Sequence, residues 1–280
     1  MRYFRQRIVI IAVLCLFSLE VLTKNFENLE TYRDQINKSQ VLLLQRDRNQ
    51  ASQLLISAIN KEGIKSPSYI ELSRVLKKTV ETFLSEKAQQ TYELALSIYP
   101  TDKSLAIEKI KESLNLDLLN GLALKALNFT LLSQRECSLA KKIRLDLIKL
   151  NPFDVELEKL FFLELICQKY RAEALAYLAK IDPLLQTLPF WKVAKQRILG
   201  NEFLLAQNDS RLLTSEYPEL VYIYWISEKD IKKRKIFAYN YKKLCQTPIS
   251  FDKAYSWSDP WVCEHIKEID DFQIKEEKTN

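Results

Sequence analysis

The chain has 280 residues, a formal net charge of +6, 47% apolar residues and 28% charged residues, proportions that are typical of a folded globular protein with a sizeable core. Its three glycines argue against a hairpin-rich β fold and exclude the known glycine-rich nucleotide loops, because glycine supplies the backbone conformations that both require. A single histidine removes most zinc sites and most histidine-based acid–base catalysis.

Residues 1–23 are predicted to be a targeting segment. Three arginines close to the N-terminus precede an apolar run, Ile8–Leu19, which is the layout of a secretory signal. The longer apolar segment Ile8–Leu22 is shorter than the roughly 17–25 residues of a typical membrane span, although Arg7 and Lys24 could extend it by snorkelling. A cleaved signal peptide and an uncleaved anchor that tethers the chain through Ile8–Leu22 both stay open. In both cases the remaining chain is translocated to the far side of the membrane. We therefore expect a periplasmic protein or an inner-membrane-anchored protein that faces the periplasm.

The chain after residue 27 is predicted to be helical, because apolar residues recur three and four positions apart. Two predicted helical segments have closely similar sequences: "KSLAIEKIKESLNLD" at 103–117 and "CSLAKKIRLDLIKLN" at 137–151. Successive ends fall at Asp117, Asn151 and Asp182, with the last interval slightly shorter than the one before it. This near-regular interval predicts one helical hairpin per repeat, in which no hairpin buries its apolar face alone. An ordinary helical bundle without a repeat is the alternative.

This pattern resembles the tetratricopeptide repeat (TPR) family, best over Ser85–Pro183 and in degenerate form from Asn49 to Cys245. Asn128 falls where the family has a small residue, and the third interval is short, so a Sel1-like or irregular hairpin array also stays open. The resemblance implies an all-α fold, a right-handed solenoid of antiparallel helical hairpins, whose concave groove binds a protein or peptide partner. In the unit Gly121–Pro152, the family's core and end positions are occupied by Leu124, Leu127, Leu131, Ala140 and Pro152.

The predicted organisation places TPR-like repeats at 24–216 and a degenerate terminal hairpin with an aromatic cap at 217–270. A tail follows at 271–280. The cap contains Trp257 and Trp261 around Pro260. Such an aromatic cluster either covers the exposed end of a solenoid or forms a ligand platform.

Four cysteines follow residue 23, an even number that fits an oxidising compartment. Cys245 and Cys263 lie in one C-terminal segment and are predicted to form a disulfide, with two buried free thiols as the alternative. Cys137 and Cys167 lie near the turns of consecutive repeats. Equivalent points on stacked hairpins are on the order of 10 Å apart, and a disulfide needs Cα atoms within about 7 Å. A bond between them is therefore expected only if the shorter third repeat brings them together.

The most basic stretch runs from 229 to 243. Its side chains form either the solvated face of a terminal helix or an adaptor surface for anionic lipid or nucleic acid, and the predicted export disfavours nucleic acid. The residues of this predicted basic surface are Lys232, Lys233, Arg234, Lys235, Lys242 and Lys243.

No catalytic, metal-binding or cofactor-binding set is predicted. Cys263 and His265 are two positions apart, so they do not face each other on one helix or strand. Glu156, Glu158 and Glu164 could serve a cell-wall-active enzyme, but their spacing is typical of a solvated helix face. The sequence therefore favours a non-enzymatic exported scaffold that mediates protein–protein interaction or complex assembly in a bacterial cell envelope.

Overall fold

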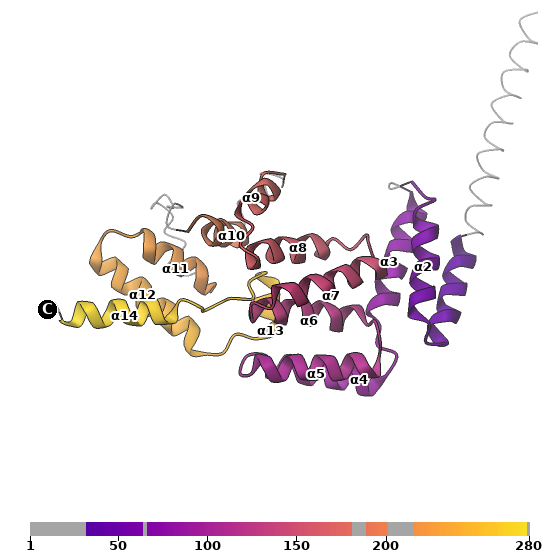
Figure 1. Cartoon of the computed structure of the whole chain (residues 1–280), viewed down its shortest axis with the longest axis horizontal. Helices are drawn as coiled ribbons and strands as arrows, with labels where there is room; N and C mark the ends of the chain where they lie inside the picture. The colour runs from indigo at the N-terminus through magenta and orange to yellow at the C-terminus, as the bar shows by residue number, and fades with distance from the viewer. Residues whose placement is uncertain (1–31, 64–65, 181–188, 201–215, 279–280) are drawn as a thin grey trace, which may run out of the picture. The chain divides into compact units, whose positions relative to one another are not determined.

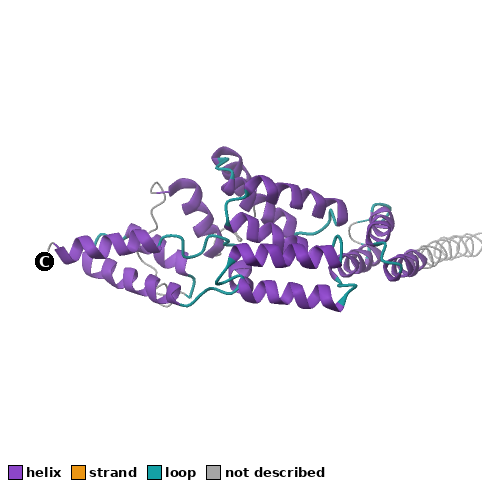
Figure 2. Cartoon of the chain, turned by 60° about the horizontal axis from the view of Figure 1, so that its bottom comes forward, coloured by secondary structure: helices purple, strands orange, loops and turns teal. Residues whose placement is uncertain are grey.

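The computed structural model of the chain describes residues 32–63, 66–180, 189–200 and 216–278. These residues form helices joined by loops and include no strand (Figure 2), so the all-α prediction is confirmed. The predicted targeting segment 1–23, with its tether Ile8–Leu22, lies outside them. In the described ranges no helix combines the length and the apolar character that a membrane span requires.

The chain divides into two compact units. The first contains residues up to Leu84 together with Leu119–Gly121 and Ile148–Asp154. The second contains Ser85–Leu118, Leu122–Leu147 and Val155–Asn280.

In the first unit, a helix within residues 32–44 precedes α2 (Arg48–Ile59) and α3 (Pro67–Glu81). Helix α3 begins where Ser66 caps it and Pro67 occupies its first turn, the residue types that favour a helix start. Arg48 is buried and donates hydrogen bonds to the carbonyl oxygens of Thr79 (3.2 Å) and Thr82 (2.5 Å). A cation there satisfies unpaired carbonyls at the end of α3 and complements the helix dipole.

The second unit contains most of a series of helices that pack in adjacent pairs: α4 (Glu86–Ile98) with α5 (Lys103–Leu116), α6 (Gly121–Ser133) with α7 (Cys137–Leu150), and α8 (Glu156–Cys167) with α9 (Arg171–Lys180) (Figure 1). The structure explains why Asn128 departs from the repeat pattern. Its side-chain amide is fully buried and donates to the carbonyl oxygen of Ala140 (2.6 Å), which ties α6 to α7.

Two of the turns in this series repeat the same backbone geometry at the repeat interval. Arg135 follows α6 and Lys169 follows α8, with φ angles of 64° and 61°. In each turn the next residue donates its N–H to a carbonyl near the helix end, Glu136 to Leu131 (2.9 Å) and Tyr170 to Leu165 (3.0 Å). This is the Schellman helix end, which usually uses glycine. The chain uses a basic residue at both positions instead.

The C-terminal part of the second unit contains α10 (Pro189–Leu199), α11 (Pro218–Ser227), α12 (Ile231–Gln246), α13 (Phe251–Ser256) and α14 (Ile266–Lys278). Helix α12 packs beside both α11 and α14 (Figure 1). Residues 251–261, which include α13, pack against earlier helices of the same unit. The ring of Phe251 lies 5.2 Å from that of Tyr99, at the end of α4, and the indole N–H of Trp261 donates to the carbonyl oxygen of Leu132 in α6 (2.7 Å).

Gly121 provides a test of the packing in the first unit. A Cβ at this position would overlap Cγ1 of Val80, a buried β-branched side chain with little freedom to move. We expect Gly121→Ala to lower the free energy of unfolding by about 1–3 kcal/mol, measured by urea denaturation. Gly63→Ala is the matched control, because nothing lies within 4 Å of a Cβ built there. Equal effects of the two substitutions would contradict this packing.

Candidate functional site

A buried cluster of charged groups surrounds Arg197, near the end of α10 in the second unit. Nη2 of Arg197 lies 2.7 Å from Oδ1 of Asp259 and 3.7 Å from Oε2 of Glu219, and Nη1 contacts Oε1 of Glu264. The side chains of Asp259 and Glu219 are 1% and 2% exposed. Because an unpaired buried charge is costly, these carboxylates depend on the guanidinium, which joins α10, α11 and the loop before α14.

Hydrogen bonds complete the coordination of the two buried carboxylates. Glu219 accepts from the hydroxyl of Tyr241 (2.9 Å) and from the backbone N–H of Cys263 (2.7 Å). Asp259 accepts from the hydroxyl of Tyr217 (2.9 Å). Burial raises the pKa of Glu219, although Arg197 acts in the opposite direction. Burial alone would lower the pKa of Arg197, but Asp259 and the other carboxylates raise it above its usual range.

His265 lies at the edge of this cluster. Its Nε2 is 3.4 Å from Oε2 of Glu219, and its ring stacks on Tyr222 with centroids 3.7 Å apart. Burial and the charge of Arg197 lower the pKa of His265 below its ordinary value, and they outweigh Glu264 and Glu268. The imidazole is therefore neutral at pH 7.

A disulfide joins Cys245, in α12, to Cys263, in the loop before α14. Cys263 has a φ angle of 66°, and its N–H donates to Glu219. The bond thus fixes the loop that presents Glu264 and His265.

Beside this cluster the second unit has an open cavity of about 770 Å³, within the roughly 300–1,000 Å³ of typical ligand pockets. Its wall includes the two turns that carry Arg135 and Lys169, together with Arg171, Tyr170 and the inner residues Arg197 and His265. We call this cavity the basic pocket.

The second disulfide, between Cys137 and Cys167, lies in the wall of the basic pocket. Their Cα atoms are 5.7 Å apart, closer than the spacing of equivalent points on stacked hairpins. The reason is that the two residues are not equivalent: Cys137 begins the second helix of one pair, and Cys167 ends the first helix of the next.

Among the described residues, four cationic side chains and one carboxylate line the basic pocket. The carboxylate, Glu264, is already matched, because Arg135 lies 2.6 Å from its Oε2 and Arg197 contacts its other oxygen. Burial alone would raise the pKa of Glu264, but these two arginines and His265 lower it. Lys169 and Arg171, which also line the pocket, are exposed.

The side chains of the predicted basic surface on α12 have different surroundings. The guanidinium of Arg234 lies over the ring of Trp225, at 4.6 Å, and over that of Phe272, at 4.8 Å. Lys242 pairs with Asp270 at 2.7 Å. The remaining members are all exposed: Lys232, Lys233, Lys235 and Lys243.

The glutamates considered for an enzyme pair with neighbouring helices of the second unit. Glu164 is buried and lies 2.7 Å from Nε of Arg144 in α7. Glu158 accepts a hydrogen bond from the hydroxyl of Tyr177 in α9 (2.5 Å). Glu156 lies 2.6 Å from Nζ of Lys125 in α6.

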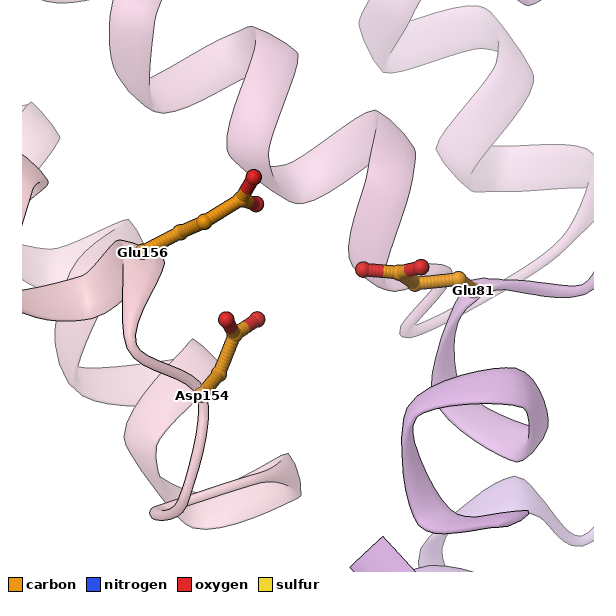
Figure 3. A group of neighbouring side chains, drawn as sticks. All are labelled: Glu81, Asp154 and Glu156. Carbon is orange, nitrogen blue, oxygen red and sulfur yellow. The ribbon is translucent and has the colours of Figure 1, made fainter. Parts of the chain in front are cut away.

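Figure 3 shows the carboxylate of Glu156 together with those of Glu81 and Asp154. Glu81 ends α3, and Asp154 lies in the loop before α8. Glu81 and Asp154 belong to the first unit and Glu156 to the second.

The sequence does not predict a cluster of Arg197, Glu219 and Asp259, because the three residues come from separate elements. No spacing pattern relates them, although Asp259 stands in the aromatic cluster around Pro260. The basic turn residues could have been recognised, because Arg135 and Lys169 are separated by the repeat interval.

Comparisons with models of known families, with characterised proteins and with solved structures give no match.

The site makes the titration of His265 a direct test, since it is the chain's one histidine. We expect NMR to give its imidazole a pKa below 6.5. Folding then disfavours the protonated ring, so the stability that the neutral ring contributes is present above pH 6.5 and is lost as the pH falls through the folded-state pKa.

A pair of variants identifies the cause of this shift. Glu264→Gln should lower the pKa of His265 further, because Glu264 stabilises the protonated ring. Asp252→Asn, at an exposed position in α13, should leave the pKa unchanged. An unshifted pKa in the parent chain would contradict the buried arrangement.

Proposed function

We propose that the chain is a non-enzymatic exported scaffold of TPR-like helical hairpins, which binds a protein partner and assembles it into a complex in a bacterial cell envelope. The observation that carries the proposal is the basic pocket, in which the turns of consecutive helical pairs meet a loop fixed by a disulfide. The adjacent pairing of helices supports a repeat array. In this proposal the array is a right-handed solenoid, and its partner lies in the concave groove and reaches the basic pocket.

The disulfides support the export part of the proposal. All four cysteines beyond residue 23 are paired, and disulfides persist in oxidising compartments such as the periplasm. The proposed tether is the apolar segment Ile8–Leu22, either retained as an anchor or removed as part of a signal peptide.

The contacts favour the scaffold over the two alternatives. Cys263 is bonded to Cys245, so it offers no thiolate nucleophile, and the three candidate glutamates join neighbouring helices. The lipid or nucleic-acid adaptor is less favoured because Arg234 and Lys242 contact other side chains of the unit. These contacts reduce the continuous basic face on α12.

Site-specific photo-crosslinking tests the scaffold. We expect a photoreactive residue in place of Tyr170, 49% exposed in the wall of the basic pocket, to give a discrete protein adduct in the native cell. The control position is Tyr239 on α12, which is 63% exposed, and should give no such adduct. Equal adducts at both positions, or none at either, would argue against a partner at this pocket.

Thiol alkylation tests the compartment. If the chain is exported, alkylation of denatured protein from acid-quenched cells should leave Cys137, Cys167, Cys245 and Cys263 unmodified until a reductant is added. Mass spectrometry of the peptides reports each cysteine separately. Four free thiols at the time of quenching would contradict an oxidising compartment.

A further inference from the structure

We propose that residues 247–250, which join α12 to α13, bind an extended segment of another protein by main-chain pairing, in the manner of an added β-strand. These residues line an open groove of about 700 Å³ in the second unit, which we call the α12–α13 groove. No described residue lines both this groove and the basic pocket. The inference therefore goes beyond the proposed function and does not depend on it.

The extended conformation of this segment follows from its sequence. A proline has a fixed φ of about −65° and disfavours helical backbone at the residue before it, so Pro248 ends α12. Thr247 has φ −92° and ψ 127°, and Ser250 has φ −61° and ψ 154°, values that are typical of extended backbone. Ser250 then caps α13, because its hydroxyl oxygen accepts from the N–H of Lys253 (3.4 Å).

The main chain of the segment has unpaired donors and acceptors. Helices α3, α4 and α5 end with an N–H that bonds back into the helix, whereas α12 ends without such a bond. Among the described residues, the N–H and C=O groups of Thr247 and Ile249 have no hydrogen-bond partner. Residues two apart in an extended chain present these groups to the same edge. Pro248 stands between them without an N–H, as proline does in edge strands.

The main chain of the segment borders the α12–α13 groove. All four consecutive residues 247–250 line it. Because the side chains of an extended segment alternate in direction, four residues in succession can line one wall only where the main chain itself is part of that wall. Leu244 and Trp257, both half-buried, also line the groove, and the ring of Trp257 stacks on that of Tyr217 with centroids 4.9 Å apart. A bound strand can therefore place alternate apolar side chains against these two residues.

The segment is held at both ends. On one side Cys245 is bonded to Cys263. On the other side Phe251 is buried, with its ring 5.2 Å from that of Tyr99 and 5.5 Å from that of Phe129. A segment that is already extended and fixed loses little conformational freedom when a peptide pairs with it.

The charge beside the segment favours another protein over a second copy of this chain. Lys243 and Lys253 are exposed and line the groove, whose described lining residues include one carboxylate, that of Glu216. In a symmetric pair of copies, the lysines of both chains would lie beside the paired segments, where like charges oppose association. An uncharged peptide does not meet this opposition.

Fluorescence anisotropy with the full chain tests the proposal. The probe is a labelled peptide of alternating valine and serine, blocked at both ends and about six residues long, so that its extended length exceeds that of the segment. Two comparison peptides carry N-methyl groups on the valines or on the serines, which removes alternate N–H donors and leaves the side chains unchanged.

We expect the parent peptide to bind. Because only alternate N–H groups of a strand face its partner, one methylated peptide should bind at least about tenfold more weakly and the other within about threefold of the parent. Equal binding of all three peptides, or no binding of the parent peptide, would overturn the proposal.

A pair of variants at one position places the site. Ile249→Pro removes the N–H of this residue and should weaken the parent peptide by on the order of tenfold. Ile249→Ala shortens the side chain but keeps the N–H, and should bind within about threefold of the unsubstituted chain. Circular dichroism checks folding. If Ile249→Pro is unfolded, NMR of the unsubstituted chain gives the answer, since the peptide should shift the amide signals of Thr247 and Ile249. Equal losses in the two folded variants, or unshifted amides, would overturn the proposal.

Analytical ultracentrifugation separates this binding from self-association. A dimer that Ile249→Pro dissociates, together with no binding of the valine–serine peptide, would assign the segment to a second copy and overturn the proposal. The crosslinking experiment at Tyr170 is independent of both results. An adduct there without peptide binding would leave the scaffold in place and reject this inference, whereas peptide binding without an adduct would do the reverse.

Discussion

The second unit depends on one guanidinium placed among carboxylates that cannot be solvated. Asp259 and Glu219 are almost fully buried, and each lies within 4 Å of Arg197. Removing one partner from a buried charged group is strongly destabilising, by about 3–5 kcal/mol, since the remaining charges lose their compensation. The cluster thus fixes the positions of α10, α11 and the loop before α14 relative to one another. Since that loop presents Glu264 and His265, the same interaction sets the inner wall of the basic pocket.

The helical character of the described chain was predictable because it depends on short-range features of the sequence. Apolar side chains three and four apart define helix faces, and few glycines leave little provision for tight β hairpins. The repeat interval seen in the sequence corresponds in the structure to the repeated turns at Arg135 and Lys169. Their left-handed conformation was not predictable from residue type, since a basic residue rarely occupies it without support from the surrounding helix end.

The charged cluster could not be predicted because its members are brought together only by tertiary packing. Arg197, Glu219 and Asp259 lie in separate elements, and each alone is typical of a solvated helix or loop. The disulfide between Cys137 and Cys167 was also not predictable from sequence spacing alone. Sequence spacing indicates how far apart the repeats are but not which helix ends become neighbours, and the cysteines occupy adjoining ends of successive pairs. Distances between equivalent repeat positions therefore do not apply to them.

Inner and outer charges of the basic pocket have different physical roles. The inner arginines have carboxylate partners in the protein, and binding to a new anion would require breaking contacts that are strengthened by burial. An exposed cation such as Lys169 is hydrated and can exchange water for a ligand at little cost in free energy. The inner cluster therefore supplies rigidity to the wall of the pocket. Preorganisation of this kind reduces the ordering cost of association.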